Sequence, residues 1–275
     1  MAYSKSLKNK VVIITGASSG IGKALAFEFA KQEAKVVLAA RRIEKLSEVE
    51  KQLLNLGGDA FAVVADVSIE KDCENLIRQS LEKYGQIDIL VNNAGISMRA
   101  LFADADLAVI EKLMQINFWG TVYCSKFALP YLLKNRGTVV GVSSIAGYVG
   151  LPARTAYSAS KFAMQGFLES LRTENLEKGL KVLIACPGFT ASNIRNSALT
   201  ASGETQGKSP RKEEKMMPAE EVAQEIVKAI RQEKQSLILT LEGKMAVFLK
   251  KFWPQLIQKL VFKKLKNEPD SPLRK

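Results

Sequence analysis

Short, uninterrupted apolar runs alternate with longer amphipathic stretches along most of this chain, and no other feature constrains the fold as strongly. The first two runs, at residues 11–15 and 36–40, are separated by a glycine-rich turn and by a stretch at 21–31 with helical spacing. Strands that are apolar throughout are typical of parallel sheets whose two faces are both covered by helices. The pattern therefore predicts an α/β fold assembled from strand–helix units.

The same alternation continues to about residue 240 of the 275-residue chain. Because crossovers between parallel strands are right-handed, seven strands connected by helices predict a single-domain Rossmann fold, with a doubly wound seven-stranded parallel sheet and helices on both faces. The remaining strands are predicted at 60–64, 87–91, 138–142, 181–185 and 236–240, and the remaining helices at 43–56, 70–84, 106–134, 156–178 and 219–233. Residues 189–217 lack a clear period, and we expect this loop to cover a substrate, with disorder as the alternative.

The turn after the first strand reads TGASSGIG over residues 15–22. Glycines here let the backbone approach a pyrophosphate, whose negative charge is favoured by the amides at a helix N-terminus. The spacing G-x-x-x-G-x-G departs from the common dinucleotide fingerprint, and a plain tight turn is the alternative. We predict nucleotide contacts from this turn at Gly16, Ser18, Ser19, Gly20 and Ile21.

The second strand runs directly into Arg41 and Arg42, and the first acidic residue after it is Glu44. At this position a carboxylate reads the ribose 2′-hydroxyl of NAD, whereas a guanidinium accommodates the 2′-phosphate of NADP. The sequence therefore predicts NADP(H) as the cofactor, against the alternative of an ordinary solvated arginine pair. Measured preference for NADH would refute this prediction.

Polar residues also follow the third and fourth strands, where Asp66 and the stretch NNAG at 92–95 occur. The carboxyl ends of the strands form the edge of an open α/β sheet where ligands lie. Polar residues are also typical of the turns that follow strands. Neither motif alone therefore indicates a ligand site, and only the combination of motifs does.

The chain contains no histidine, which excludes Ser-His-Asp catalysis, Cys-His catalysis and histidine-ligated metals. Acid–base chemistry must therefore use Tyr, Lys, Asp, Glu or Cys. Cys73, Cys124 and Cys186 are widely spaced and form no C-x-x-C pair, so we predict buried thiols, with no disulfide framework and no metal site.

Tyr157 and Lys161 lie four residues apart on a predicted helix and so share one of its faces. A neighbouring ammonium lowers the pKa of a phenol from its ordinary value of about 10, which would make Tyr157 a proton donor in reduction and an acceptor in oxidation. Such a pair taken alone is more often an ordinary pair on a helix surface.

In combination these motifs resemble the classical short-chain dehydrogenase/reductase family over roughly residues 8–240. The features that carry the resemblance occur in the family's order and are TGASSGIG at 15–22, Asp66, NNAG at 92–95, Asn117, Ser144, Tyr157 with Lys161, and Pro187-Gly188. Arg41 also resembles the NADPH-preferring members.

The resemblance implies roles for these residues. Tyr157 would be the acid/base, Ser144 would hydrogen-bond the substrate oxygen, Lys161 would lower the Tyr157 pKa and hold the nicotinamide ribose, and Asn117 would keep a water in a proton relay. The remaining cofactor contacts implied are Asn93, Ala94 and Gly95 at the ribose, Asp66 and Val67 at the adenine, and Pro187, Gly188, Thr190 and Ser192 on the nicotinamide side. At Ser192 family members often carry threonine, and a hydroxyl remains.

The implied function is an NADP(H)-dependent oxidoreductase that interconverts a carbonyl and a secondary alcohol. The stretch VGLP at 149–152 and the tail resemble the hydroxysteroid-dehydrogenase-like branch, which favours a lipophilic substrate, with Met98, Leu151 and Phe189 as pocket lining. One alternative is a 3-oxoacyl or small-carbonyl reductase. A different class is an NADPH-binding regulatory or structural protein without turnover.

Residues 241–275 form an amphipathic basic stretch, expected as a helical extension of a catalytic domain at 1–240. Residues 231–275 contain 11 Lys/Arg and 4 Asp/Glu, so more than half of the net charge of +12 is concentrated in this segment. Because net charge is the only feature that suggests nucleic-acid binding, we set that function aside. The extension could pack on its own domain or a partner subunit, bind a membrane surface through its apolar side, or be disordered. Pro254 is expected to start a second helix or kink the first.

The N-terminal residues lack the apolar segment of a secretory signal, so we expect a cytoplasmic protein, with peripheral membrane association through the tail as an option. The family resemblance implies a homodimer or homotetramer that associates through the helices near 106–134 and 156–178.

Overall fold

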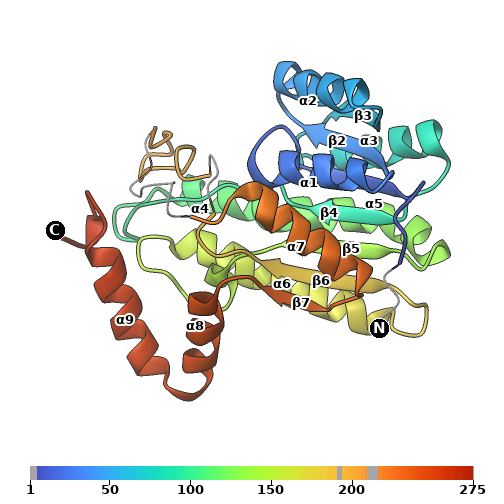
Figure 1. The fold of residues 1–275 in the computed structure, drawn as a ribbon. Helices are drawn as coiled ribbons and strands as arrows, with labels where there is room; N and C mark the ends of the chain where they lie inside the picture. The colour runs from blue at the N-terminus through green and yellow to red at the C-terminus, as the bar shows by residue number, and fades with distance from the viewer. Residues whose placement is uncertain (1–4, 191–193, 208, 210–215, 275) are drawn as a thin grey trace.

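The computed structural model describes residues 5–190, 194–207, 209 and 216–274. Its centre is one seven-stranded sheet in the order β3-β2-β1-β4-β5-β6-β7, with every neighbouring pair parallel (Figure 1). The strands are β1 (Val11–Thr15), β2 (Lys35–Ala40), β3 (Asp59–Val64), β4 (Ile89–Asn92), β5 (Thr138–Val142), β6 (Lys181–Cys186) and β7 (Ser236–Ile238). The predicted doubly wound sheet is confirmed, and the last strand ends two residues earlier than expected.

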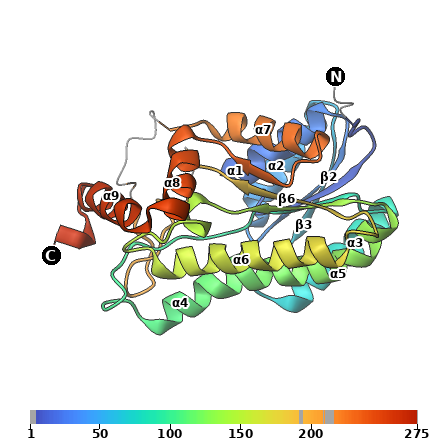
Figure 2. The same ribbon diagram turned by 90° about the horizontal axis from the view of Figure 1, so that it is seen from below.

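Helices cover both faces of this sheet, which is why its strands are apolar over most of their length. One layer contains α1 (Gly20–Lys31), α2 (Ile43–Asn55) and α7 (Ala219–Arg231). The opposite layer contains α3 (Glu70–Tyr84), α5 (Gly120–Lys134) and α6 (Thr155–Glu174), as Figure 2 shows. Each layer buries its own apolar cluster against the sheet, and the reversal of strand order beside β1 brings the first and fourth strand ends together.

The single long helix predicted over 106–134 is wrong in detail. It is divided into α4 (Leu107–Met114), a π-helical turn (Gln115–Trp119) and α5. A π turn inserts an extra residue into the helical ladder and is frequent at functional sites. Asn117 lies in the middle of this turn, so the irregular backbone positions one of the predicted catalytic residues.

The C-terminal extension forms two further helices, α8 (Leu241–Phe252) and α9 (Pro254–Lys266), followed by a short 3-10 turn (Pro272–Arg274). Thr240 caps α8, since its hydroxyl accepts a hydrogen bond from the Gly243 amide at 3.1 Å. Pro254 begins α9, where its missing amide hydrogen is tolerated. Both views place α8 and α9 at the end of the molecule where the loops after the strands gather (Figures 1 and 2).

Within the described part of the chain, no helix is long and apolar enough to cross a bilayer.

Candidate active site

The glycine-rich turn between β1 and α1 is shaped by close backbone contacts. Gly16 and Gly20 have φ angles of +67° and +53°, a region that favours glycine. A Cβ added at Gly22 would lie 2.3 Å from the Gly16 carbonyl oxygen and 2.5 Å from Asn93 Nδ2. The hydroxyl of Ser19, the N-cap residue, makes no capping bond to α1, so the turn is a cradle of backbone amides suited to an anion.

A hydrogen-bond network joins this turn to the end of β4. Thr15 Oγ1 accepts from the amides of Asn93 and Ala94, both at 3.0 Å. Asn93 Nδ2 in turn donates to the Thr15 carbonyl at 2.9 Å. The side chain of Asn93 therefore holds the loop after β4 against the glycine turn.

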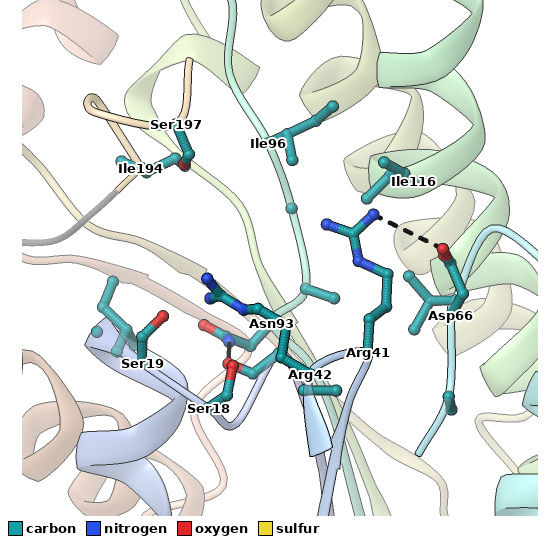
Figure 3. Close-up of a pocket in the computed structure, with 18 of the residues that line it drawn as sticks. Ser18, Ser19, Arg41, Arg42, Asp66, Asn93, Ile96, Ile116, Ile194 and Ser197 are labelled. Carbon is teal, nitrogen blue, oxygen red and sulfur yellow. Dashed lines mark hydrogen bonds and ion pairs between the residues drawn. The ribbon is translucent and has the colours of Figure 1, made fainter. Parts of the chain in front are cut away.

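A cleft of about 580 Å³ lies over these strand ends. Figure 3 shows its lining, with side chains contributed by the first four strand ends and by the loop after β6. The predicted cofactor residues that line this cleft are Gly16, Ser18, Ser19, Gly20, Ile21, Arg41, Arg42, Asp66, Val67, Asn93, Ala94 and Gly95. From the loop predicted to cover the substrate, this cleft also takes Ile194, Asn196, Ser197, Leu199 and Thr205.

The two arginines after β2 point in different directions (Figure 3). Arg41 Nη1 lies 3.6 Å from Asp66 Oδ2, while Asp66 Oδ1 accepts a hydrogen bond from the Ser68 hydroxyl at 2.7 Å. Arg42 extends toward the side of the cleft where Ser18 and Ser19 lie. The carboxylate predicted to contact an adenine is therefore also a partner of one of the two arginines.

Asn117 is fully buried, and its side-chain amide forms hydrogen bonds to two different segments of the chain. Its Oδ1 accepts from the Ile96 amide at 2.8 Å, and its Nδ2 donates to the Ile96 carbonyl and to Ser160 Oγ, both at 2.9 Å. Ser160 belongs to α6, the helix that carries Tyr157 and Lys161. The π turn thus connects the loop after β4 to α6.

Lys161 is 2% exposed, and its Nζ donates to the Val142 carbonyl at 2.9 Å. Burial lowers the pKa of this amine to about 8, and a coulombic interaction with Cys186 partly opposes the shift. The Nζ lies 5.9 Å from the centre of the Tyr157 ring. The two side chains therefore lie on the same face of α6, as the spacing predicts.

Burial raises the pKa of the Tyr157 phenol above its ordinary value. The hydrogen bond with Ser144 and the positive charges of Arg154 and Arg195 act in the opposite direction and lower this pKa. Neither arginine belongs to a motif that the sequence analysis recognised. The effect expected of Lys161 on this phenol stays a prediction.

A second cleft, of about 520 Å³, opens beside Ser144. Its lining includes Ser144 and the predicted pocket residues Leu151 and Phe189, together with Pro187 and Gly188, which the family resemblance places on the nicotinamide side. Met216 and Met217 belong to the loop predicted to cover the substrate, and Val149 belongs to the stretch VGLP. No sequence motif predicts the other members, which come from the turn after β5, from Thr240 and from the C-terminal helices: Ile145, Ala146, Thr240, Glu242, Gly243, Ala246, Val261, Lys264 and Leu265. Most of these side chains are apolar, so the cleft is suited to a lipophilic molecule.

Some predicted residues lie elsewhere. Met98 is fully buried and packs with Leu113 and Leu199, so its prediction as pocket lining is wrong. Thr190 is buried, with its hydroxyl donating to the Gly188 carbonyl at 3.3 Å. Ser192 lies outside the described residues.

The three cysteines are free and buried in the structure. Among the described residues, no group of three or more His, Cys, Asp or Glu side chains is placed to hold a metal ion.

A doubly wound sheet with a glycine cradle, and a serine, tyrosine and lysine gathered around β5 and α6, define the class of nucleotide-binding oxidoreductases. The sequence profile of the short chain dehydrogenases matches residues 10–202. The chain belongs to this family, the classical short-chain dehydrogenases/reductases.

Several relatives are similar over much of the chain. A dehydrogenase/reductase SDR family protein 7-like from Dictyostelium discoideum is 36% identical over 265 residues, which cover 94% of this chain and 82% of the relative. The 11-beta-hydroxysteroid dehydrogenase A of Sesamum indicum is 41% identical over 204 residues, or 74% of this chain and 58% of the relative.

Solved structures share the fold. A short chain dehydrogenase/reductase from Burkholderia phymatum in complex with NAD has a TM-score of 0.83 at 23% identity and covers 92% of this chain and 96% of its own. An alcohol dehydrogenase from Thermococcus sibiricus complexed with 5-hydroxy-NADP has a TM-score of 0.74 at 23% identity and covers 84% of this chain and 95% of its own.

Proposed function

We propose that this protein is an NADP(H)-dependent oxidoreductase that interconverts a carbonyl and a secondary alcohol on a lipophilic substrate. The observation that carries the proposal is the second cleft, where Ser144 is a polar group in a largely apolar lining. A carbonyl oxygen bound at Ser144 would leave the rest of a lipophilic molecule against Leu151, Phe189 and Val261.

The residues of the first cleft fit a dinucleotide. The glycine cradle and the start of α1 would hold the pyrophosphate, Asn93 to Gly95 would border a ribose, and Asp66 with Val67 would border the adenine. A Cβ at Gly95 would lie 3.1 Å from Asn117 Oδ1 and 3.5 Å from Lys161 Nζ, so this glycine lets the loop pass close to the catalytic groups. When bound, the cofactor supplies or accepts the hydride.

NADP(H) is favoured over NAD(H) because two guanidinium groups lie at the end of β2, where a 2′-phosphate would bind. Arg42 has the more direct role in this proposal, because Arg41 is also engaged by the Asp66 carboxylate at 3.6 Å. Arg41 would bind the phosphate from the side of Asp66, and Arg42 from the side of Ser18 and Ser19.

In reduction, Tyr157 donates its phenolic proton to the substrate oxygen while Ser144 hydrogen-bonds and orients that oxygen; in oxidation the same phenol accepts the proton. Lys161 would hold the nicotinamide ribose, and Asn117 would keep a water in the relay that restores the proton. Pro187 and Gly188 would border the nicotinamide side, and contacts from Thr190 and Ser192 stay predictions of the family resemblance. Arg154 and Arg195 add positive charge that favours the phenolate.

Two alternatives remain testable against this function. A 3-oxoacyl or small-carbonyl reductase would use the same chemistry, but a cleft of about 520 Å³ with apolar walls favours a larger lipophilic molecule. An NADPH-binding regulatory or structural protein would bind the nucleotide and turn nothing over. The hydroxysteroid name of the sesame relative supports a lipophilic substrate without identifying it.

The experiment is NADPH oxidation by the wild type and by Tyr157→Phe on panels of steroid, long-chain, 3-oxoacyl and simple ketones. Removing the transferable proton while keeping the ring should lower kcat by at least about 100-fold. NADPH affinity should change little, which a fluorescence titration measures. Near-normal turnover by the variant would sink the mechanism, and NADPH binding without activity on every panel would favour the non-enzymatic alternative.

We further propose that the extension contacts a membrane surface while its other side packs on its own domain. Phe248, Phe252 and Trp253, here called the tail aromatics, are more than half exposed and contact one another, with ring centres 5.0 to 6.4 Å apart. Neighbouring lysines supply positive charge toward anionic lipid. Such a protein would be cytoplasmic and associate with the membrane peripherally.

We also propose a homodimer or homotetramer that associates through α4, the π turn and α5 on one side and α6 on the other. Trp119, Tyr131 and Phe162 are 40 to 42% exposed on or beside these helices. Exposed aromatics of this kind are enriched in subunit interfaces.

A further inference from the structure

Glu268, in the segment after α9, is buried between two arginines of the catalytic domain. Its Oε2 lies 2.9 Å from Arg154 Nη2 and 3.8 Å from Arg99 Nη2. The side chains of Glu268, Arg154 and Arg99 are only 5%, 11% and 7% exposed. Here the three residues are called the tail lock.

The tail lock joins segments that are far apart in sequence. Arg154 directly precedes α6, and its carbonyl accepts from the Ser158 amide at 2.9 Å. Arg99 lies in the loop after β4, and its amide donates to the Leu199 carbonyl of the substrate loop at 2.8 Å. The neighbouring residues of both segments are also paired, since the Ala100 amide donates to the Ala153 carbonyl at 3.0 Å.

Further hydrogen bonds fix the segment after α9, which carries Glu268. Arg99 also donates to the Pro269 carbonyl, and Ser271 Oγ donates to the Leu265 carbonyl at 2.7 Å. Leu265 is buried and lines the second cleft. The residue that anchors the tail is therefore three positions from a residue that forms the wall of the cleft.

Charge makes this arrangement sensitive to any single change. Removing one partner of a buried ion pair leaves the other charge poorly compensated in a poorly solvated place, which is strongly unfavourable. Loss of the Glu268 carboxylate would take one negative charge away from two guanidinium groups, one of them on a residue only three positions from Tyr157.

We infer that Glu268 is a positioning residue for the reaction, which fixes the C-terminal helices as a wall of the substrate cleft and balances the arginine charge beside Tyr157. The inference rests on the proposed function and adds a residue outside the family's motifs. It makes the tail part of the catalytic site rather than an appendage.

The charged and polar groups around Tyr157 determine how a substitution in the tail lock would change the pH dependence of the reaction. Burial raises the pKa of the phenol, Ser144, Arg154 and Arg195 lower it, and Cys186 raises it. The Lys161 Nζ also faces the phenol, 5.9 Å from the ring centre. In alcohol oxidation the phenolate is the active form, so the rate rises with pH through this pKa. Glu268→Gln exposes Tyr157 to more positive charge and should move that rise to lower pH, whereas Arg154→Gln should move it to higher pH.

The test compares full-length wild type, Glu268→Gln, Glu268→Asp and Arg154→Gln. Hydrogen–deuterium exchange should show at least about tenfold faster exchange over α8 and α9 in Glu268→Gln. In the oxidation assay, KM should rise about tenfold because a wall of the cleft is released. Glu268→Asp, which keeps the charge, should restore much of the protection and the KM.

Opposite displacements of the pH profile by Glu268→Gln and Arg154→Gln distinguish a role at the site from general loss of stability. Glu233→Gln is the control, because it removes the carboxylate of a surface ion pair with Lys5 and should leave exchange in the tail and the profile unchanged. Displacements in the same direction, or wild-type exchange in Glu268→Gln, would overturn the inference. Faster exchange without activity on any substrate would instead mean that the proposed function has failed while the lock stands.

Discussion

The close packing at Gly22 makes a quantitative prediction about the nucleotide cradle. In Gly22→Ala, the new Cβ would lie 2.3 Å from the Gly16 carbonyl oxygen, 2.5 Å from Asn93 Nδ2 and 2.9 Å from the Gly16 carbonyl carbon. Two of these three atoms are backbone, so the turn itself must move. Asn93 is equally constrained, because its Nδ2 also donates to the Thr15 carbonyl at 2.9 Å.

Two effects of opposite sign determine how Gly22→Ala changes the free energy of unfolding. Replacing a helical glycine by alanine stabilises by up to about 1 kcal/mol through backbone entropy. Forcing an extra methyl group into a packed site costs about 1–3 kcal/mol. We expect the packing term to dominate, with a net loss of about 1 kcal/mol and a fall in Tm of about 2–4 °C for a domain of this size.

Cofactor binding should suffer more than stability, because the atoms that move form the cradle. We expect the NADPH dissociation constant to rise at least tenfold, or about 1.4 kcal/mol. Thermal unfolding with and without NADPH, together with a fluorescence titration, measures both effects.

Gly166→Ala is the matched control. Gly166 is also within a helix, α6, but no atom lies within 4 Å of its added Cβ. This variant should gain about 0.5–1 kcal/mol and keep wild-type NADPH affinity. If Gly22→Ala were equally stable and bound NADPH as the wild type does, the reasoning from the crowded cradle would be refuted.

Three other predictions follow from charge and exposure. Arg42→Glu should weaken NADPH binding at least about tenfold with a smaller effect on NADH, while Arg78→Glu on α3 should change neither; equal losses for both cofactors would contradict the 2′-phosphate assignment. Serine at all three tail aromatics should lower co-sedimentation with anionic vesicles, whereas Phe102→Ser, equally exposed but outside the tail, should not; unchanged binding would eliminate the lipid role. Burial lowers the pKa of Lys161 from its ordinary 10.5 to about 8 in the folded protein. Between these two pH values the unfolded chain binds more protons than the folded one, so the contribution of Lys161 to the free energy of unfolding should rise with pH in this range. Wild type should therefore gain stability relative to Lys161→Met between about pH 8 and pH 10 in chemical denaturation, and a constant difference would refute the shift.

The sheet could be predicted from sequence because its signal is local. Each strand is a short apolar run, and the turn at 15–22 carries its glycines in the sequence itself. Parallel pairing then brings the ends of β1 to β4 to one edge, so the predicted nucleotide contacts from separate motifs meet in one cleft. Strand periodicity and the handedness of crossovers are sufficient for that step.

Other features have no local signal. The π turn at Gln115–Trp119 is hidden because its residues fit an ordinary helix, and only the bonds of Asn117 to Ile96 and Ser160 reveal its purpose. Arg154 and Glu268 are 114 residues apart, and an ion pair at that separation has no period to detect. Met98 illustrates the converse error, since an apolar residue near a site can belong to the core instead.

This division explains why the chemistry is easier to infer than the substrate. Tyr157, Lys161 and Asn117 lie on helices packed against the sheet, and their spacing is readable in the sequence. The second cleft is closed instead by the loop after β6 and by α8 and α9, whose apolar residues fit packing, a partner or a lipid equally well before the structure is known. Substrate choice in this protein should therefore change through the tail and its anchor at Glu268, while the proton transfer at Tyr157 is retained.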